Sequence, residues 1–169
     1  MNKKDLRYIK TENLIKDTYL SLKTTKNVKV KDLCDKAMIN KSTFYDHYET
    51  IEFLHKYVCH DFILEILNKC DKITNIKKDI GRFINKVYTL FSENKKTIEK
   101  LYDSDLYLFV NDVENEIMEN FLSSITNEKN EYIIRFCIGG AFRALVFETD
   151  SQKNQQTLEL VKTVLKNHL

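Results

Sequence analysis

Six polar side chains between residues 41 and 47 are of the kinds that can read DNA. They supply an amine, two hydroxyls, a phenol, a carboxylate and an imidazole: Lys41, Ser42, Thr43, Tyr45, Asp46 and His47. If residues 41–48 form a helix, Phe44 and Tyr48 lie four apart and face inward, which leaves these six facing outward. Such a face offers the donors and acceptors that contact base edges and phosphates in a DNA major groove.

A second short helix is predicted just before this one, at Val30–Ala37, with three residues on one apolar stripe: Leu33, Cys34 and Ala37. Residues 38–40 are predicted as the turn between the two helices. Asn40 suits the N-cap of the second, because its side-chain oxygen can accept from the first free amides. Two short helices joined by a tight turn, the second with a polar outer face, predict a helix-turn-helix whose second helix reads DNA.

Positive charge is concentrated in the same part of the chain. Residues 1–50 hold 11 Lys and Arg against 7 Asp and Glu, whereas the remaining residues hold 16 against 18. Phosphate contacts require such a basic excess. Lys29 and Lys31 flank the start of the first short helix, where a basic side chain and free backbone amides can hold a phosphate.

The stretch AMINKSTFYDHYETIEFL (residues 37–54) resembles the signature of the TetR family of transcriptional regulators. The resemblance covers about the first third of the chain. It implies that the six polar residues make groove and backbone contacts, and that the protein dimerises through its last two long helices. Three positions depart from the family pattern: Met38 replaces the usual turn glycine, Asp46 lies beside phosphates, and Ile51 replaces a lysine. The sequence YETIEFL fits the subset that resembles dihydroxyacetone-kinase-operon regulators.

The composition predicts an all-α protein, because the chain has no proline, only three glycines and abundant helix-forming residues. We expect a helix-turn-helix domain at residues 1–49 and a helical effector-binding and dimerisation domain at residues 50–169. Ser104 is the expected cap of the seventh helix. Apolar periodicity and turn residues place nine helices at about residues 5–23, 30–37, 41–48, 50–70, 76–91, 95–102, 105–125, 131–147 and 155–167.

The predicted helix at residues 131–147 has almost no polar face, so it needs cover on every side. In a chain of 169 residues, a second subunit is the expected cover. Two helices from each subunit would form a four-helix bundle. The predicted homodimer interface comprises Phe136, Gly139, Gly140, Arg143, Phe147, Leu158, Val161 and Leu165.

A small-molecule effector site is predicted among aromatic residues of the central helices, although aromatics at helical spacing also suit a plain core. The candidate pocket residues are Tyr88, Phe91, Tyr102, Tyr107 and Phe136. The leading hypothesis is a homodimeric repressor of a palindromic operator in double-stranded DNA, released by an unknown effector. The alternative is a helical interaction protein whose degenerate helix-turn-helix no longer reads DNA.

Other classes of function find little support. No motif of a hydrolase, metalloprotease or phosphate-binding loop is present, so we predict no enzyme and no cofactor. A zinc site is suggested by His55, Cys59 and His60, but no further ligands lie at a suitable spacing, so we predict no bound metal. The four cysteines are widely spaced and predict buried thiols. A charged N-terminus and the lack of a long apolar run predict a cytoplasmic protein with no membrane partner.

Overall fold

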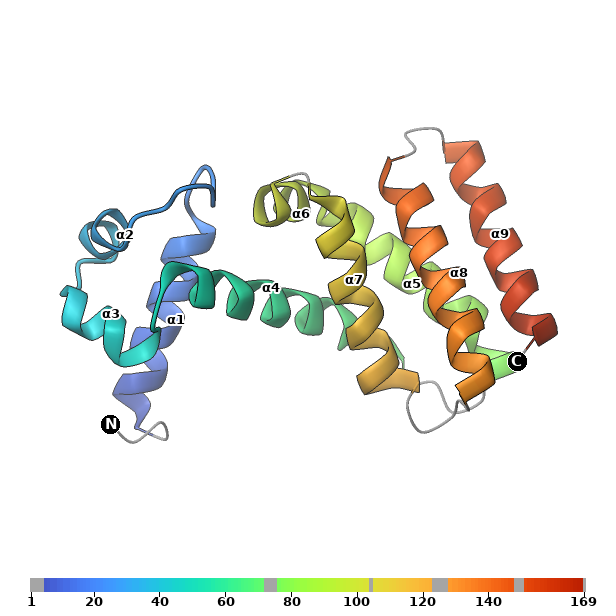
Figure 1. The fold of residues 1–169 in the computed structure, drawn as a ribbon, viewed down its shortest axis with the longest axis horizontal. Coiled ribbons are helices and arrows are strands. Elements are labelled where there is room, and N and C mark those ends of the chain that lie inside the picture. Colours follow the sequence, from blue (N-terminus) through green and yellow to red (C-terminus); the bar gives the residue numbers. More distant parts are fainter. Residues whose placement is uncertain (1–4, 72–75, 104, 123–127, 148–150, 169) are drawn as a thin grey trace. The chain divides into compact units, whose positions relative to one another are not determined.

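The computed structural model describes residues 5–71, 76–103, 105–122, 128–147 and 151–168. Within these residues the protein is all helical, with nine α-helices, one π-helical segment and no strand (Figure 1). The predicted fold class and number of helices are therefore confirmed. No helix within the described ranges is long and apolar enough to cross a membrane.

The chain forms two compact units. Unit 1 comprises Met1–Asp61 and Glu99–Asp103, and unit 2 comprises Phe62–Ile98 and Ser104–Leu169. The sequence predicts the boundary between residues 49 and 50, just before helix α4 (Ile51–Leu67). The structure instead divides the chain within α4 and again within α6 (Lys95–Tyr102), so each of these helices contributes residues to both units.

Unit 1 is built on α1 (Leu6–Leu20), α2 (Val30–Ala37), α3 (Lys41–His47) and the first part of α4. The bounds of α2 agree with the prediction, and α1 ends earlier than predicted, at Leu20. Each helix turns an apolar stripe inward, as its periodicity predicts. The resulting core includes side chains with at most 2% exposure: Ile15, Tyr19, Leu33, Phe44, Tyr48 and Leu54.

Local hydrogen bonds fix where these helices begin. The carboxylate of Asp5 accepts from the backbone N–H of Arg7 at 2.8 Å and caps α1. The hydroxyl of Thr50 accepts from the backbone N–H of Phe53 at 3.0 Å at the start of α4. Asn40 holds the N-cap position of α3, but its side chain makes no capping hydrogen bond, so that part of our prediction is wrong.

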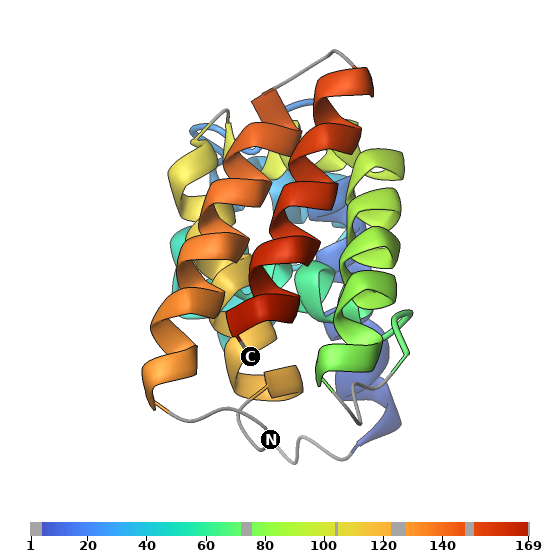
Figure 2. The same cartoon turned by 90° about the vertical axis from the view of Figure 1, so that its right-hand side faces the viewer.

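Unit 2 is a layered arrangement of long helices: α5 (Ile76–Glu93), α7 (Leu106–Ile117), α8 (Glu128–Phe147) and α9 (Ser151–His168). Helix α9 packs between α8 and α5, and α8 packs against α7 (Figure 2). The helix expected at residues 105–125 is shorter than predicted, because a π-helical segment, Met118–Leu122, follows α7. Asp105 caps α7 by accepting from the N–H of Leu108 at 3.2 Å, and the predicted cap, Ser104, lies outside the described residues.

Candidate nucleic-acid interface

The turn between α2 and α3 has the geometry of a Schellman motif. The N–H of Ile39 donates to the carbonyl of Cys34 at 3.0 Å, and the N–H of Met38 donates to the carbonyl of Asp35 at 3.3 Å. Met38 has φ 53° and ψ 43°, the left-handed conformation that usually requires glycine. The side chain of Met38 is 92% exposed, so it contributes no packing in return. This left-handed residue ends α2 and begins the turn that leads to α3.

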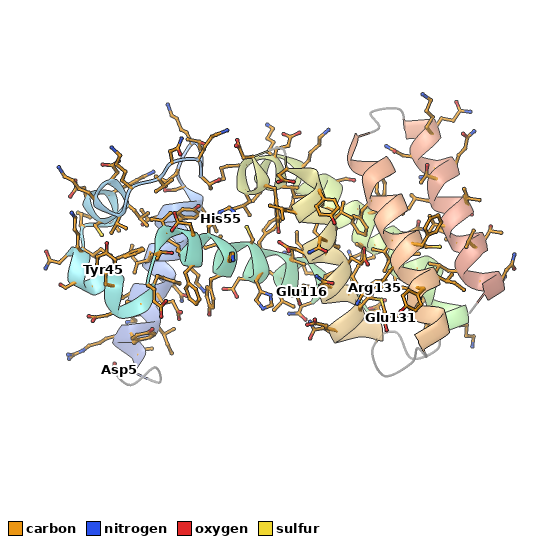
Figure 3. All side chains as sticks on the ribbon, in the orientation of Figure 1. Asp5, Tyr45, His55, Glu116, Glu131 and Arg135 are labelled. Carbon is orange, nitrogen blue, oxygen red and sulfur yellow. The ribbon has the colours of Figure 1, made fainter. Side chains whose placement is uncertain are left out.

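Helix α3 has one polar and one buried face. Lys41, Ser42, Tyr45 and Asp46 are exposed, and Thr43 is half-buried. Tyr45 lies on α3 at the surface of unit 1 (Figure 3) and is 55% exposed. Its ring is roughly perpendicular to that of Phe44, with ring centroids 5.4 Å apart. These five residues therefore lie where the sequence predicted them, on a continuous surface that can present donors and acceptors to a ligand.

Aromatic rings hold the buried face of α3 in place. Phe44 and Tyr48 are buried with ring centroids 6.0 Å apart, and the ring of Tyr48 meets that of Tyr57 of α4 edge-on at 5.8 Å. Burial, together with the nearby carboxylate of Glu12, raises the pKa of Tyr48. Its hydroxyl has no hydrogen-bond partner, so Tyr48 acts as an apolar anchor.

An ion pair joins helix α1 to helix α4 next to Tyr57. The ammonium of Lys16 binds the carboxylate of Asp61 at 2.9 Å and lies 5.3 Å from the ring centroid of Tyr57. Both charged side chains are partly shielded, with 20% and 39% exposure. Because the pair is less exposed than a fully solvated one, solvent screens the attraction between its charges less. The pair joins α1 to α4 within unit 1.

His47 does not face outward, contrary to our prediction. Its ring lies against Tyr8 of α1, with centroids 3.9 Å apart and planes tilted by 31°. Both ring nitrogens are buried and neither has a hydrogen-bond partner. We missed the role of Tyr8, although the spacing of Tyr8, Ile15 and Tyr19 already places the three on one helix face. The contact between α1 and the end of α3 depends on tertiary packing, which short-range periodicity does not report.

The start of α2 offers two exposed lysines. Lys29 is at the N-cap position with an extended backbone and no side-chain cap, and its carbonyl accepts from the N–H of Leu33 at 3.1 Å. Lys31 is exposed in the first turn of the same helix. Uncapped amides at a helix start, next to two ammonium groups, are suited to a phosphate. Asp32 in the same turn reduces the local positive charge.

The end of α6 contacts the connection between α1 and α2, a link that we did not predict. The hydroxyl of Thr25 donates to the carbonyl of Lys100 at 2.7 Å, and the ammonium of Lys26 pairs with Asp103 at 2.7 Å. The ammonium of Lys100 in turn donates to the carbonyl of Leu20. These partners are far apart in sequence, so no local pattern signals the link. Through it, unit 1 incorporates a segment of a later helix.

The predicted dimer residues of α9 do not face outward. Leu158, Val161 and Leu165 are buried inside their own chain, whereas Leu160 of the same helix is 64% exposed. Our prediction took the helix's strongest apolar stripe as the intersubunit face. That stripe instead covers the core of unit 2.

On α8 the prediction is partly wrong. A Cβ at Gly139 would meet the carboxylate of Glu114 of α7 at 3.3 Å, so this glycine serves packing within the chain. Arg135 also faces α7, where its guanidinium binds Glu114 at 3.1 Å as well as Glu131 of α8 at 2.9 Å (Figure 3). Hydrogen bonding to these carboxylates raises the pKa of Arg135.

The opposite stripe of α8 is exposed. Tyr132 and Phe136 keep 76% and 81% of their surface exposed, and a Cβ at Gly140 would meet no atom within 4 Å. These three residues recur every fourth position and share one side of the helix. The side chains of two other predicted interface residues, Arg143 and Phe147, lie outside the described part of the structure.

The predicted effector-pocket residues are divided between the two units and between buried and exposed positions. Phe136 and Tyr107 are exposed, so neither is enclosed, and Tyr102 belongs to unit 1. Phe91 is buried against Phe109 and Phe142, with ring centroids 5.3 and 5.5 Å away. Tyr88 is half-buried. Phe91 therefore belongs to the apolar core of unit 2, the alternative that aromatics at helical spacing had left open.

His55 has partners within the protein core. Its Nδ1 lies 2.9 Å from the hydroxyl of Tyr19, and its Nε2 lies 3.6 Å from the Sγ of Cys59. Burial raises the pKa of Tyr19 to about 12. Among the described residues, no group of three or more His, Cys, Asp or Glu side chains gathers as a metal site would require. All four cysteines are buried thiols outside any disulfide, as predicted.

Comparisons with known proteins add no family. No family model matches the chain, and no curated protein matches it either.

Proposed function

We propose that the protein is a homodimeric, sequence-specific DNA-binding regulator of the TetR type, acting as a repressor that a small-molecule effector releases. The observation that carries this proposal is helix α3, which exposes Lys41, Ser42, Tyr45 and Asp46 while its opposite face is buried. It follows α2 through a tight left-handed turn, as a reading helix follows its supporting helix in a helix-turn-helix. Exposed Lys29 and Lys31 supply positive charge for neighbouring phosphates.

Within this proposal, each exposed residue of α3 has a distinct role. Lys41 donates to a guanine or a phosphate, and Thr43 offers its methyl group to thymine and its hydroxyl to a phosphate. Tyr45 donates its hydroxyl to the DNA backbone. Asp46 accepts from a cytosine amine, and its carboxylate repels sites where a phosphate or a carbonyl takes that place.

The exposed apolar stripe of α8 supports the dimer. Tyr132, Phe136 and Gly140 form that stripe, and Leu160 on the adjacent helix α9 adds further exposed apolar surface. Exposed aromatic side chains next to a glycine allow a partner helix to approach closely. A palindromic operator requires two reading helices about 34–36 Å apart, which one chain cannot supply.

The links through α4 and α6 support effector control. Both helices contribute residues to unit 1 and to unit 2. The end of α6 is hydrogen-bonded to the connection between α1 and α2 through Thr25 and Lys100. An effector that prefers one arrangement of unit 2 would therefore bias the position of the reading helix, and by linkage DNA would oppose effector binding.

The test is selection of DNA by the full-length protein from a pool of duplexes with a randomised centre, followed by fluorescence anisotropy on the enriched duplex. We expect an inverted repeat and an affinity that falls steeply with salt. Lys41→Ala should weaken binding about tenfold or more, whereas Lys166→Ala, at an exposed site on α9, should leave it unchanged. Failure to enrich any sequence would contradict the proposal.

The dimer is tested separately by sedimentation equilibrium. Phe136→Glu should convert the protein to monomers, because it places a charge in the middle of the apolar stripe. The matched control is Tyr107→Glu, which changes an equally exposed aromatic residue, 79% exposed, on α7. If the two variants change the oligomeric state equally, the apolar stripe of α8 is not the dimer interface.

A second candidate is an interaction protein whose helix-turn-helix no longer reads DNA. Asp46 favours it, because an exposed carboxylate on the reading face repels phosphates. Under this alternative, Lys41→Ala and Tyr45→Phe would leave the cellular role of the protein intact, and the selection above would enrich nothing.

A further inference from the structure

The C-terminal end of α3 is held from two sides. Tyr48 meets Tyr57 of α4, with centroids 5.8 Å apart, and His47 meets Tyr8 of α1 at 3.9 Å. Tyr8 is 5% exposed, so the contact with His47 lies within the folded body of unit 1. Helix α3 has seven residues, too few to hold its own structure in water, so its orientation depends on these tertiary contacts.

Neither nitrogen of the His47 ring is accessible to a phosphate. Both nitrogens are buried without a partner, so neither can donate to DNA while the ring lies on Tyr8. Burial lowers the pKa of His47, even though the carboxylates of Glu12 on α1 and Asp46 on α3 act in the opposite direction. Burial therefore favours the uncharged form of the ring. A half-buried imidazole whose two nitrogens are both covered is poorly suited to bind a phosphate but well suited to stack on a phenol.

We propose that Tyr8 and His47 are a positioning pair that fixes the angle of α3 on unit 1, and that His47 serves DNA recognition through Tyr8 without touching the DNA. This inference rests on the proposed function, in which α3 is the reading helix. Helix α1 then contributes to DNA recognition as well as to the core of unit 1. It also replaces the phosphate contact that the family resemblance implies for His47.

The test uses the full-length protein and the duplex that the wild type enriches, with a scrambled duplex of the same composition. His47→Phe keeps the ring and removes both nitrogens, so its affinity should stay within about twofold of the wild type at an unchanged salt slope. His47→Ala and Tyr8→Ala each remove half of the stack. They should weaken binding to the enriched duplex at least about fivefold and lower its preference over the scrambled duplex.

The losses of DNA affinity caused by the two alanine substitutions should not be additive. If the residues act as one pair, the double variant Tyr8→Ala/His47→Ala binds no more weakly than either single variant. Tyr8→Phe should retain wild-type affinity, because it keeps the ring. Titration to saturation gives the active fraction of each variant, which separates a lost orientation from a lost fold. If Tyr8→Ala does not fold, Tyr8→Leu takes its place, since it keeps apolar volume without a ring.

Two results would overturn the positioning pair while leaving the proposed function intact. One is a loss in His47→Phe equal to that in His47→Ala, with the salt slope reduced by about 0.9, which would assign a direct phosphate contact to His47. The other is wild-type binding by all the variants. If the wild type enriches no sequence, the proposed function itself fails. The pair is then tested by NMR titration of His47, whose pKa should rise toward 6.5 in Tyr8→Ala, and an unchanged pKa would overturn it.

Discussion

Replacing Met38 by glycine is expected to stabilise the protein, although it removes a large side chain. Met38 has φ 53°, a conformation that costs an L-residue other than glycine about 1–2 kcal/mol. The side chain is 92% exposed, so its loss removes almost no buried surface. Glycine also makes the unfolded chain more flexible, which costs about 0.4–1 kcal/mol of stability. The midpoints of these two ranges differ by about 0.8 kcal/mol, so a net gain of that order is expected in the free energy of unfolding.

Matched variants at the same position isolate the backbone effect. Met38→Ala removes the same side chain but keeps the strain, and Met38→Asn introduces a residue that tolerates the left-handed conformation. Urea unfolding, followed by circular dichroism at one fixed protein concentration, should rank stability as glycine, then asparagine, then alanine. In a chain of this size, a gain of 1 kcal/mol corresponds to about 2–4 °C in Tm. A glycine variant no more stable than the alanine variant would refute the assigned turn geometry and the strain derived from it.

Three further changes test the packing beneath α3. Lys16→Met removes the partner of Asp61 and should lower the free energy of unfolding by about 1 kcal/mol in urea titrations, because the pair is only partly exposed; no loss would place the pair in the class of weak surface bridges. Tyr48→Phe removes a buried hydroxyl that has no partner and should leave stability unchanged or higher, and a loss above about 1 kcal/mol would mean that the hydroxyl is hydrogen-bonded. Burial lowers the pKa of His47 in the folded protein, so as the pH is lowered below 6.5 the unfolded state binds the proton more readily and the protein loses stability. His47→Phe should reduce this dependence of Tm on pH in thermal melts, and an unchanged dependence would contradict the burial of the ring.

Local sequence patterns were sufficient for the helices and for most of the polar face of α3. The bounds of α2 and α6 agree with those predicted, because short amphipathic helices between polar connections leave a clear periodicity. Phe44 and Tyr48 are buried while Lys41 and Tyr45 are exposed, since helical spacing alone separates the two faces. The sequence also showed that a residue other than glycine would occupy the turn at Met38.

Only the tertiary structure decided which way ambiguous residues face. His47 was predicted outward, because a histidine on a polar face gives no sign that Tyr8 of another helix will cover it. Leu158 and Leu160 lie on the same helix, and the sequence does not say which of them faces the core; the packing of α9 against α8 and α5 does. The hydrogen bond between Thr25 and Lys100 joins residues 75 positions apart. Contacts at such separations form through packing of whole helices, and a local pattern carries no record of them.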